Sequence, residues 1–251
     1  MSLDFRALNA AELVSQVTAR GDSLLEGDAL AILANPHCTT QVCQTIAQNR
    51  QLTSHYSVRM RLVGHRATPQ AEAMRFIHFL FWPDLLRLSL DVRIPAPVRG
   101  ALERQLLSRV EKLALGERVT AARRCSHELA LKFLFDHVRV FAALLVNQRL
   151  REDDLLMFIN SSRATVEKLT LIAGDRKWSN RYPIRKALVL NGTTPRAIAA
   201  SQLRFLSKRD LAGIYSRPET SVYLKRCIEK LREADGRPKT VDFSPPAGRI
   251  E

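Results

Sequence analysis

The residues with the clearest chemical potential are basic, and they gather near the C-terminal end. The chain has 251 residues and a formal net charge of +14. Residues 172–233 hold 14 lysines and arginines against 5 acids, whereas residues 1–97 hold 9 against 8. Positive side chains in rows can follow a phosphate backbone or an acidic protein segment. The candidate binding residues are Arg176, Lys177, Arg181, Arg185, Lys186, Arg204, Lys208 and Arg209.

Two other roles for these cations stay open. A basic helix face can be a solvated surface that keeps a protein soluble. Arg185 also has an identical counterpart, Arg59, 126 residues earlier in the chain. A residue kept at the same place in two copies of a repeat can serve packing between helices instead of binding.

Trp178 lies inside this basic segment, in RKWSNRY, with Tyr182 one helical turn further on. An aromatic side chain among cations can stack on a nucleic-acid base. The residue that matches Trp178 in the earlier copy is Leu52, however, and large aromatic residues are usually buried. We therefore expect Trp178 to pack in the core, and Trp82 to pack at the turn before Pro83.

Asp84 and Asp210 could act as general bases if a cleft held them with a perturbed pKa. Both occupy the same position in two similar segments, just before the apolar stretches LLRL and LAGI. A carboxylate favours the positive N-terminal end of a helix. We expect both aspartates to cap helices, and the run Glu152-Asp153-Asp154 to open another helix in the same way.

The cysteines and histidines form no metal-binding signature. Cys38, Cys43, Cys125 and Cys227 include no CxxC pair, and the six histidines show no HxxxH or HExxH spacing. No glycine-rich phosphate loop is present. We expect reduced and mostly buried thiols, no metal and no cofactor.

Helices must position these side chains, because apolar residues recur at three- and four-residue spacing almost throughout. The segments VRGALERQLLSRVEKLAL and RVFAALLVN show the pattern, and no segment alternates with period two over the length of a strand. The sequence therefore predicts an all-α fold.

Two Thr-Pro pairs mark helix openings. Thr68-Pro69 and Thr194-Pro195 predict helices near 69–80 and 195–206. In each, the threonine hydroxyl can accept an amide hydrogen of the first turn, and proline fits the first helical position because it has no amide hydrogen.

The chain contains an internal duplication. A shift of 126 residues aligns 46–88 with 172–214 without a gap, and 15 of 43 positions are identical. The matches include the tyrosine, the Thr-Pro pair and a Phe-Leu pair in register. Units of two helices, each about 30 to 45 residues long and stacked side by side, are typical of an α-solenoid.

This pattern resembles HEAT and armadillo-type repeats, in particular HEAT-like proteins found in bacteria, and the resemblance covers residues 28–234. It implies a right-handed α-solenoid of stacked HEAT-like helical pairs. We expect an N-terminal capping helix in 1–25, a helical-repeat domain in 26–235 and a flexible tail in 236–251.

The expected function is that of a non-catalytic scaffold or adaptor. Solenoids offer surfaces, and a basic C-terminal third favours an acidic partner, either a protein segment or a nucleic acid. No run of 18 apolar residues occurs and the N-terminus does not resemble a signal peptide, so we expect a cytoplasmic protein that does not insert into a membrane.

The alternative is an enzyme. The chain also resembles HEAT-like alkylpurine DNA glycosylases in its expected fold and its charge. That resemblance implies an aspartate and tryptophans in a basic concave cleft, for which Trp82, Trp178, Asp84 and Asp210 are the residues of suitable type. The two hypotheses differ in a structure, since a glycosylase needs these side chains exposed together.

Overall fold

The computed structural model describes residues 4–236, with side chains up to residue 233. These residues form α-helices and three short 3-10 helices, without any strand. The prediction of an all-α fold is confirmed. Within the described part of the chain, no helix is both long and apolar enough to cross a membrane. Beyond Gly236, the tail expected at 236–251 lies outside the described residues.

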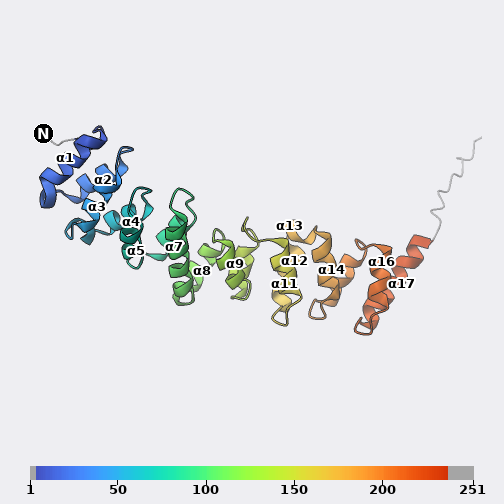
Figure 1. The fold of residues 1–251 in the computed structure, drawn as a ribbon. Coiled ribbons are helices and arrows are strands. Elements are labelled where there is room, and N and C mark those ends of the chain that lie inside the picture. Colours follow the sequence, from blue (N-terminus) through green and yellow to red (C-terminus); the bar gives the residue numbers. More distant parts are fainter. Residues whose placement is uncertain (1–3, 237–251) are drawn as a thin grey trace, which may run out of the picture. The chain divides into compact units, whose positions relative to one another are not determined.

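The chain divides into two compact units, and each is described by itself. Unit 1 is Met1–Ala130 and unit 2 is Leu131–Glu251, so the division falls within α9 (His127–Phe133). Within each unit, helices that adjoin in the chain lie near one another (Figure 1). The α-helices of unit 1 are α1 (Ala10–Arg20), α2 (Glu26–Ala34), α3 (Thr40–Gln48), α4 (Tyr56–Gly64), α5 (Gln70–Ile77), α6 (Trp82–Ser89), α7 (Ala96–Arg109) and α8 (Leu115–Ala122).

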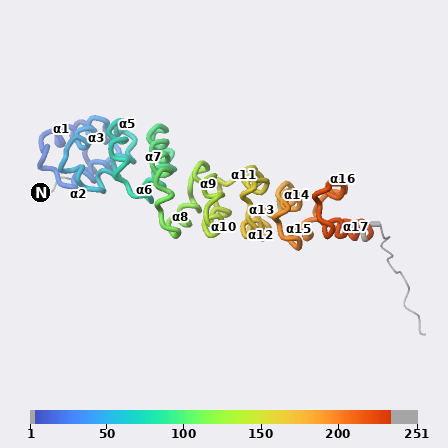
Figure 2. Tube along the Cα trace, turned by 90° about the horizontal axis from the view of Figure 1, so that it is seen from below, coloured from blue at the N-terminus to red at the C-terminus, as the bar shows by residue number. Residues whose placement is uncertain are grey.

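Unit 2 continues with the same kind of short helix (Figure 2). Its α-helices after α9 are α10 (Val138–Leu144), α11 (Glu152–Ile159), α12 (Val166–Gly174), α13 (Arg176–Ser179), α14 (Tyr182–Leu190), α15 (Arg196–Leu203), α16 (Lys208–Tyr215) and α17 (Val222–Gly236). The acidic run at 152–154 opens α11 as expected, and the Arg151 amide donates to the Asp154 carboxylate at 2.9 Å.

The helices of the two units coincide after a shift of 126 residues. After this shift, α3, α4, α5 and α6 begin and end at the same positions as α12, α14, α15 and α16, respectively. The packing partners coincide as well: α4 contacts α2 and α5 in unit 1, and α14 contacts α11 and α15 in unit 2. The same set of helices with the same neighbours, called the frame below, therefore occurs twice. It extends over a longer stretch than the aligned residues 46–88 and 172–214.

A recurring turn restarts the chain between helices. In unit 1 the turn begins at Asn35, at His65 and at Asp91, and in each case the amide two residues on donates to the side chain. The amide three residues on donates to the backbone carbonyl of the same residue. Unit 2 repeats this at Asn191, whose side chain accepts from the Thr193 amide at 2.7 Å. A short side chain with an acceptor fits this role because it can reach its own neighbouring backbone.

The Thr-Pro pairs open helices, but not by the capping that we expected. Pro69 and Pro195 are the N-cap residues of α5 and α15, outside the first helical position. The hydroxyls of Thr68 and Thr194 are buried and have no hydrogen-bond partner. Each threonine lies at the end of the recurring turn, where its amide donates back to residue 65 or 191. The turn therefore orients the chain, and the threonine is part of the packed interior.

Apolar positions fill the interior of both units. Ile46 and Leu62 in unit 1 are fully buried, as are their counterparts Ile172 and Leu188 in unit 2. Full burial of such a side chain is worth about 1.5 to 3 kcal/mol. Helices of 8 or 9 residues gain little stability by themselves, so this packing holds the frame together.

Candidate functional site

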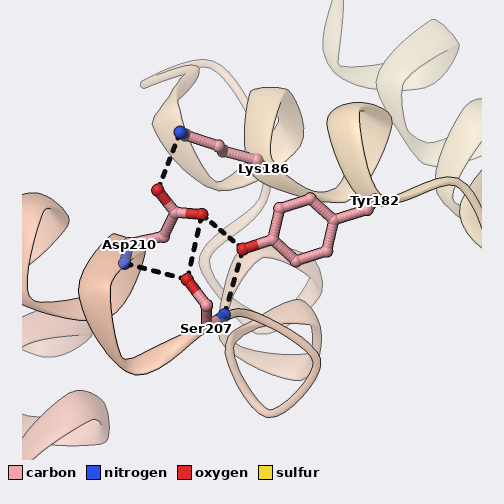
Figure 3. Close-up of polar contacts among 4 residues, drawn as sticks. All are labelled: Tyr182, Lys186, Ser207 and Asp210. Atoms are coloured by element: carbon pink, nitrogen blue, oxygen red, sulfur yellow. Dashed lines mark hydrogen bonds and ion pairs between the residues drawn. The ribbon is translucent and has the colours of Figure 1, made fainter.

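The basic cluster predicted near the C-terminal end is largely engaged in contacts within unit 2. Figure 3 shows Lys186 bound to Asp210, with a distance of 2.8 Å between Nζ and Oδ1. The Tyr182 hydroxyl donates to the same carboxylate and accepts from the Ser207 amide at 3.0 Å. The bonds from Lys186 and Tyr182 lower the pKa of Asp210 to about 2, so this carboxylate stays charged and paired near neutral pH.

Other members of the cluster also have partners inside unit 2. Arg181 forms an ion pair with Glu152. Arg185 donates to the Ser179 carbonyl at 2.5 Å and lies over the ring of Phe205. These contacts fix side chains that a binding surface would need to present.

The remaining predicted cations divide into two groups. Lys177 lies over the ring of Trp178 and Arg204 over that of Phe205. Arg176 and Arg209 are exposed without a hydrogen bond or ion pair to any described residue, and Lys208 is exposed too. A binding role for the eight predicted residues stays a prediction, with Arg176 and Arg209 as its best placed members.

The tyrosine–aspartate part of this network and the contacts of Arg185 recur in unit 1, so they belong to the repeated frame, whereas Met60 and Phe81 stand at the positions of Lys186 and Ser207. Tyr56 donates to Asp84 at 2.5 Å and accepts from the Phe81 amide at 3.2 Å. Arg59 donates to the Thr53 carbonyl and lies over the ring of Phe79, as Arg185 does with the matching residues. The packing role considered for Arg59 and Arg185 is what these contacts support.

Asp84 and Asp210 are not helix caps. Each is the third residue of its helix, whereas the N-cap residues are Phe81 and Ser207. Their carboxylates instead bind a tyrosine from two helices earlier in the chain, so they join α4 to α6 and α14 to α16. Position three still lies in the first turn, where the helix favours a negative charge.

The two tryptophans differ in burial. Trp178 is 1% exposed, and its indole Nε1 donates to the Leu145 carbonyl at 2.9 Å, so its expected packing in the core is confirmed. Trp82 is the first residue of α6, is only half-buried, and donates to Glu117 at 2.8 Å. The glycosylase alternative needs exposed tryptophans beside an available aspartate, and these four side chains do not provide that arrangement.

An arginine-lined recess in unit 1 is a better candidate site. The recess has a volume of about 400 Å³ and lies between the turn at His65 and the turn at Asp91. Its lining includes the four guanidinium side chains of Arg61, Arg66, Arg87 and Arg93. Arginine suits the recognition of carboxylate and phosphate groups because its planar fork can donate two parallel hydrogen bonds.

Two of the four arginines are neutralised and two are available. Arg93 donates to Asp91, the acid in the lining, at 2.7 Å, and Arg87 binds Asp84 at 3.1 Å. The bonds from Arg93 hold the pKa of Asp91 at about 2, well below its usual range. Arg61 and Arg66 are exposed and have no ion pair with any described residue. The recess therefore carries an excess of positive charge toward solvent.

Unit 2 has a smaller recess that shares only part of these positions, since the counterparts of Arg61 and Arg87 do not line it. It lies between the turns at Asn191 and Arg217 and has a volume of about 190 Å³. The 126-residue shift places Ala187, Gly192, Gly213 and Glu219 where unit 1 has its four arginines. Since the frame is the same, the arginines of unit 1 are not required by the fold.

The net charge of the N-terminal part of the chain hides this recess. Residues 1–97 are nearly neutral overall, with 9 basic and 8 acidic residues, so a count of charges gives no sign of local excess. The signal lay in the differences between the two copies. Arg61 and Arg66 are aligned with Ala187 and Gly192, so unit 1 has two cations where unit 2 has small uncharged residues.

Comparisons with known proteins do not assign the site. No family model, no curated protein and no solved structure matches this chain.

Proposed function

We propose that this protein is a non-catalytic adaptor that binds an acidic segment of a partner protein, with the arginine-lined recess of unit 1 as the anchor. The observation that carries the proposal is the placement of four arginines around one recess, at positions where the second copy of the frame has none. The proposal moves the expected contact from the C-terminal third of the chain to unit 1.

The size and charge of the recess fit acidic side chains. A volume of about 400 Å³ lies within the range of ligand pockets, roughly 300 to 1,000 Å³. Glutamate or aspartate side chains entering the recess would meet Arg61 and Arg66, which have no competing ion pair with the described residues. Charge complementarity of this kind speeds association and selects the partner.

A protein segment fits these features better than a nucleic acid does. A nucleic-acid backbone is bound by cations in extended rows, with aromatic side chains available for stacking where bases are exposed. The cations of the recess surround a hollow together with Asp91, and Trp178 is buried. In unit 2, Lys186 and Arg181 are held by carboxylates of the chain itself.

The proposal rests on a right-handed α-solenoid of HEAT-like helical pairs as the carrier of the site. The repeated helix positions and the repeated packing partners support this arrangement. In such an array each repeat can change its exposed residues while it keeps its contacts with its neighbours. A single repeat could therefore acquire a binding recess that its counterpart lacks.

Fluorescence anisotropy of a labelled oligoglutamate peptide, measured with the full chain at two salt concentrations, tests the proposal. The double variant Arg61→Glu and Arg66→Glu should weaken binding at least about tenfold, because it reverses the two available charges of the recess. Binding by the unchanged protein should also weaken at the higher salt concentration.

The matched control is the double variant Arg176→Glu and Arg209→Glu, which makes the same change in net charge at two exposed members of the predicted C-terminal cluster. It should bind within about twofold of the unchanged protein. Loss of binding in this control and not in the recess variant would place the site in unit 2. Tighter binding of duplex DNA than of the peptide would instead favour a nucleic-acid partner.

A further inference from the structure

Two thiols and an imidazole meet in the interior of unit 1. Cys38 lies in the turn after α2, Cys43 lies in α3, and His65 follows α4. The two sulfur atoms are 3.6 Å apart, and the Cys43 sulfur is 3.3 Å from Nδ1 of His65. All three donor atoms lie within 4.8 Å of one another. Both cysteines are buried, and His65 is half-buried at the edge of the arginine-lined recess.

These spacings are close to those around a tetrahedral zinc ion. Bonds of about 2.3 Å to sulfur and 2.0 Å to nitrogen separate two sulfurs by about 3.8 Å and a sulfur from a nitrogen by about 3.5 Å. The Ala67 amide donates to Nδ1 of His65 at 3.2 Å, so this nitrogen is the unprotonated one in the ring. The Cys43 sulfur lies beside the same nitrogen, and a bound ion would compete with the Ala67 amide for its lone pair.

The charge balance of the site also suits a divalent cation. An ion that displaced the thiol protons of Cys38 and Cys43 would bind two thiolates and form a neutral group, which a buried site can hold without unpaired charge.

The three donors are specific to unit 1. The 126-residue shift places Ala164, Leu169 and Asn191 at the positions of Cys38, Cys43 and His65. The second copy thus builds the same helices and the same turn without any of the three donors. The nearby Thr68 hydroxyl is buried without a partner, but Thr194 shares that property, so the threonine belongs to the frame.

We propose that Cys38, Cys43 and His65 bind one zinc ion, with the fourth coordination position left open. This proposal departs from the expectation of no metal, which rested on sequence signatures: the ligand spacing follows no known zinc signature, and His65 comes from a separate turn. The buried Thr68 hydroxyl lies near Cys43 and has no partner among the described residues, so it can donate to the thiolate beside the ion. The site joins α3 to the turns after α2 and α4, so the ion would cross-link three segments of unit 1.

Zinc titration of the full chain, purified under reducing conditions and treated with a chelator, tests this inference. The unchanged protein should bind one zinc ion in competition with a chromophoric chelator, and its melting temperature should rise with zinc. With cobalt in place of zinc, near-ultraviolet absorption from thiolate-to-metal charge transfer should appear. Each of Cys38→Ala, Cys43→Leu and His65→Asn should weaken zinc binding at least about 100-fold, since loss of a supporting second-shell partner already costs 10- to 100-fold.

These substitutions introduce the residues of the second copy, which that frame already accommodates. The His65→Asn variant keeps an acceptor for the turn, so it separates loss of the ion from loss of folding. The control is Cys227→Ala, a thiol in α17 of unit 2, which should bind zinc as the unchanged protein does. No zinc uptake, uptake that survives all three substitutions, binding of cuprous ion alone, or a Cys38–Cys43 disulfide in the reduced preparation would each overturn the proposal.

Discussion

The recess of unit 1 and the recess of unit 2 overlap in the repeated frame at the recurring turns and differ in chemistry. The recess of unit 1 has about 400 Å³ and four arginines, and that of unit 2 has about 190 Å³ and only Arg196 and Arg217 as cations in its lining. Gly64 lines the first, and Leu190 occupies that position in the second. The two recesses thus share the positions of two turns and differ in the rest of their lining.

The comparison separates residues that hold the frame from residues that are free to differ. One tyrosine, one aspartate and one arginine recur in both units with the same partners. Their polar groups are occupied by contacts between helices and turns of the same unit. The four arginines of the recess and the thiols of Cys38 and Cys43 occur in unit 1 and have no counterpart in unit 2. In a duplicated chain, binding functions are best sought among the positions at which the copies disagree.

The largest expected effect on stability comes from substitutions of Trp178, which stands where unit 1 has Leu52. Trp178→Ala should lower the free energy of unfolding by about 3 to 5 kcal/mol, because it leaves a large cavity and an unpaired Leu145 carbonyl. Trp178→Leu, which copies unit 1, should cost less. Urea denaturation followed by circular dichroism measures both. Equal costs for the two variants would show that the cavity does not determine the loss.

A smaller effect is expected from Gly64→Leu, which gives unit 1 the residue of unit 2. A Cβ atom at Gly64 would lie 3.1 Å from Leu88 Cδ2, so the added side chain must extend toward the recess or displace Leu88. Affinity for the oligoglutamate peptide should fall about fivefold, although every arginine is retained. Unchanged affinity would mean that the arginines bind the peptide whether or not the recess is open.

The paired substitutions Tyr56→Phe and Tyr182→Phe test whether the frame is shared. Each removes one hydroxyl that joins an aspartate to a backbone amide. Both should lower the melting temperature by similar amounts, of the order of a few degrees. Scanning calorimetry of the two variants is the measurement. A clear shift in one unit and none in the other would contradict an equivalent role.

The smallest effect concerns pH and Lys168, which stands where unit 1 has Val42. Lys168 is buried, its Nζ donates to the Leu134 carbonyl at 2.9 Å, and burial lowers its pKa below the ordinary 10.5. The unfolded chain therefore holds this proton more tightly, so the folded state gains stability as pH rises toward 10.5. Lys168→Met should remove that gain. Unfolding free energies of both proteins at pH 7 and pH 10 provide the check.

Helices and their repetition could be read from the sequence because they depend on local patterns. Apolar spacing and the Thr-Pro pairs locate α5 and α15, although both helices end earlier than expected, at Ile77 and Leu203. The burial of Trp178 followed from its match with Leu52. These features are set by periodicity and by residue type.

The errors arose where a contact depends on three-dimensional placement. Threonine is a common helix cap, but the turn places the Thr68 hydroxyl in the interior, where it has no hydrogen-bond partner. Asp84 suits a cap as well, yet a tyrosine 28 residues earlier binds it. The recess and the thiol group combine residues from separate turns, and no local spacing encodes that meeting.

The turn that restarts each helix has a consequence for protein engineering. Asn35, His65, Asp91, Asn147 and Asn191 all accept an amide hydrogen two residues on, so three residue types meet one backbone requirement. An amide, an imidazole and a carboxylate differ in charge, basicity and affinity for metals. A designer could therefore exchange these residues to vary the reactivity of successive repeats, while the path of the main chain stays the same.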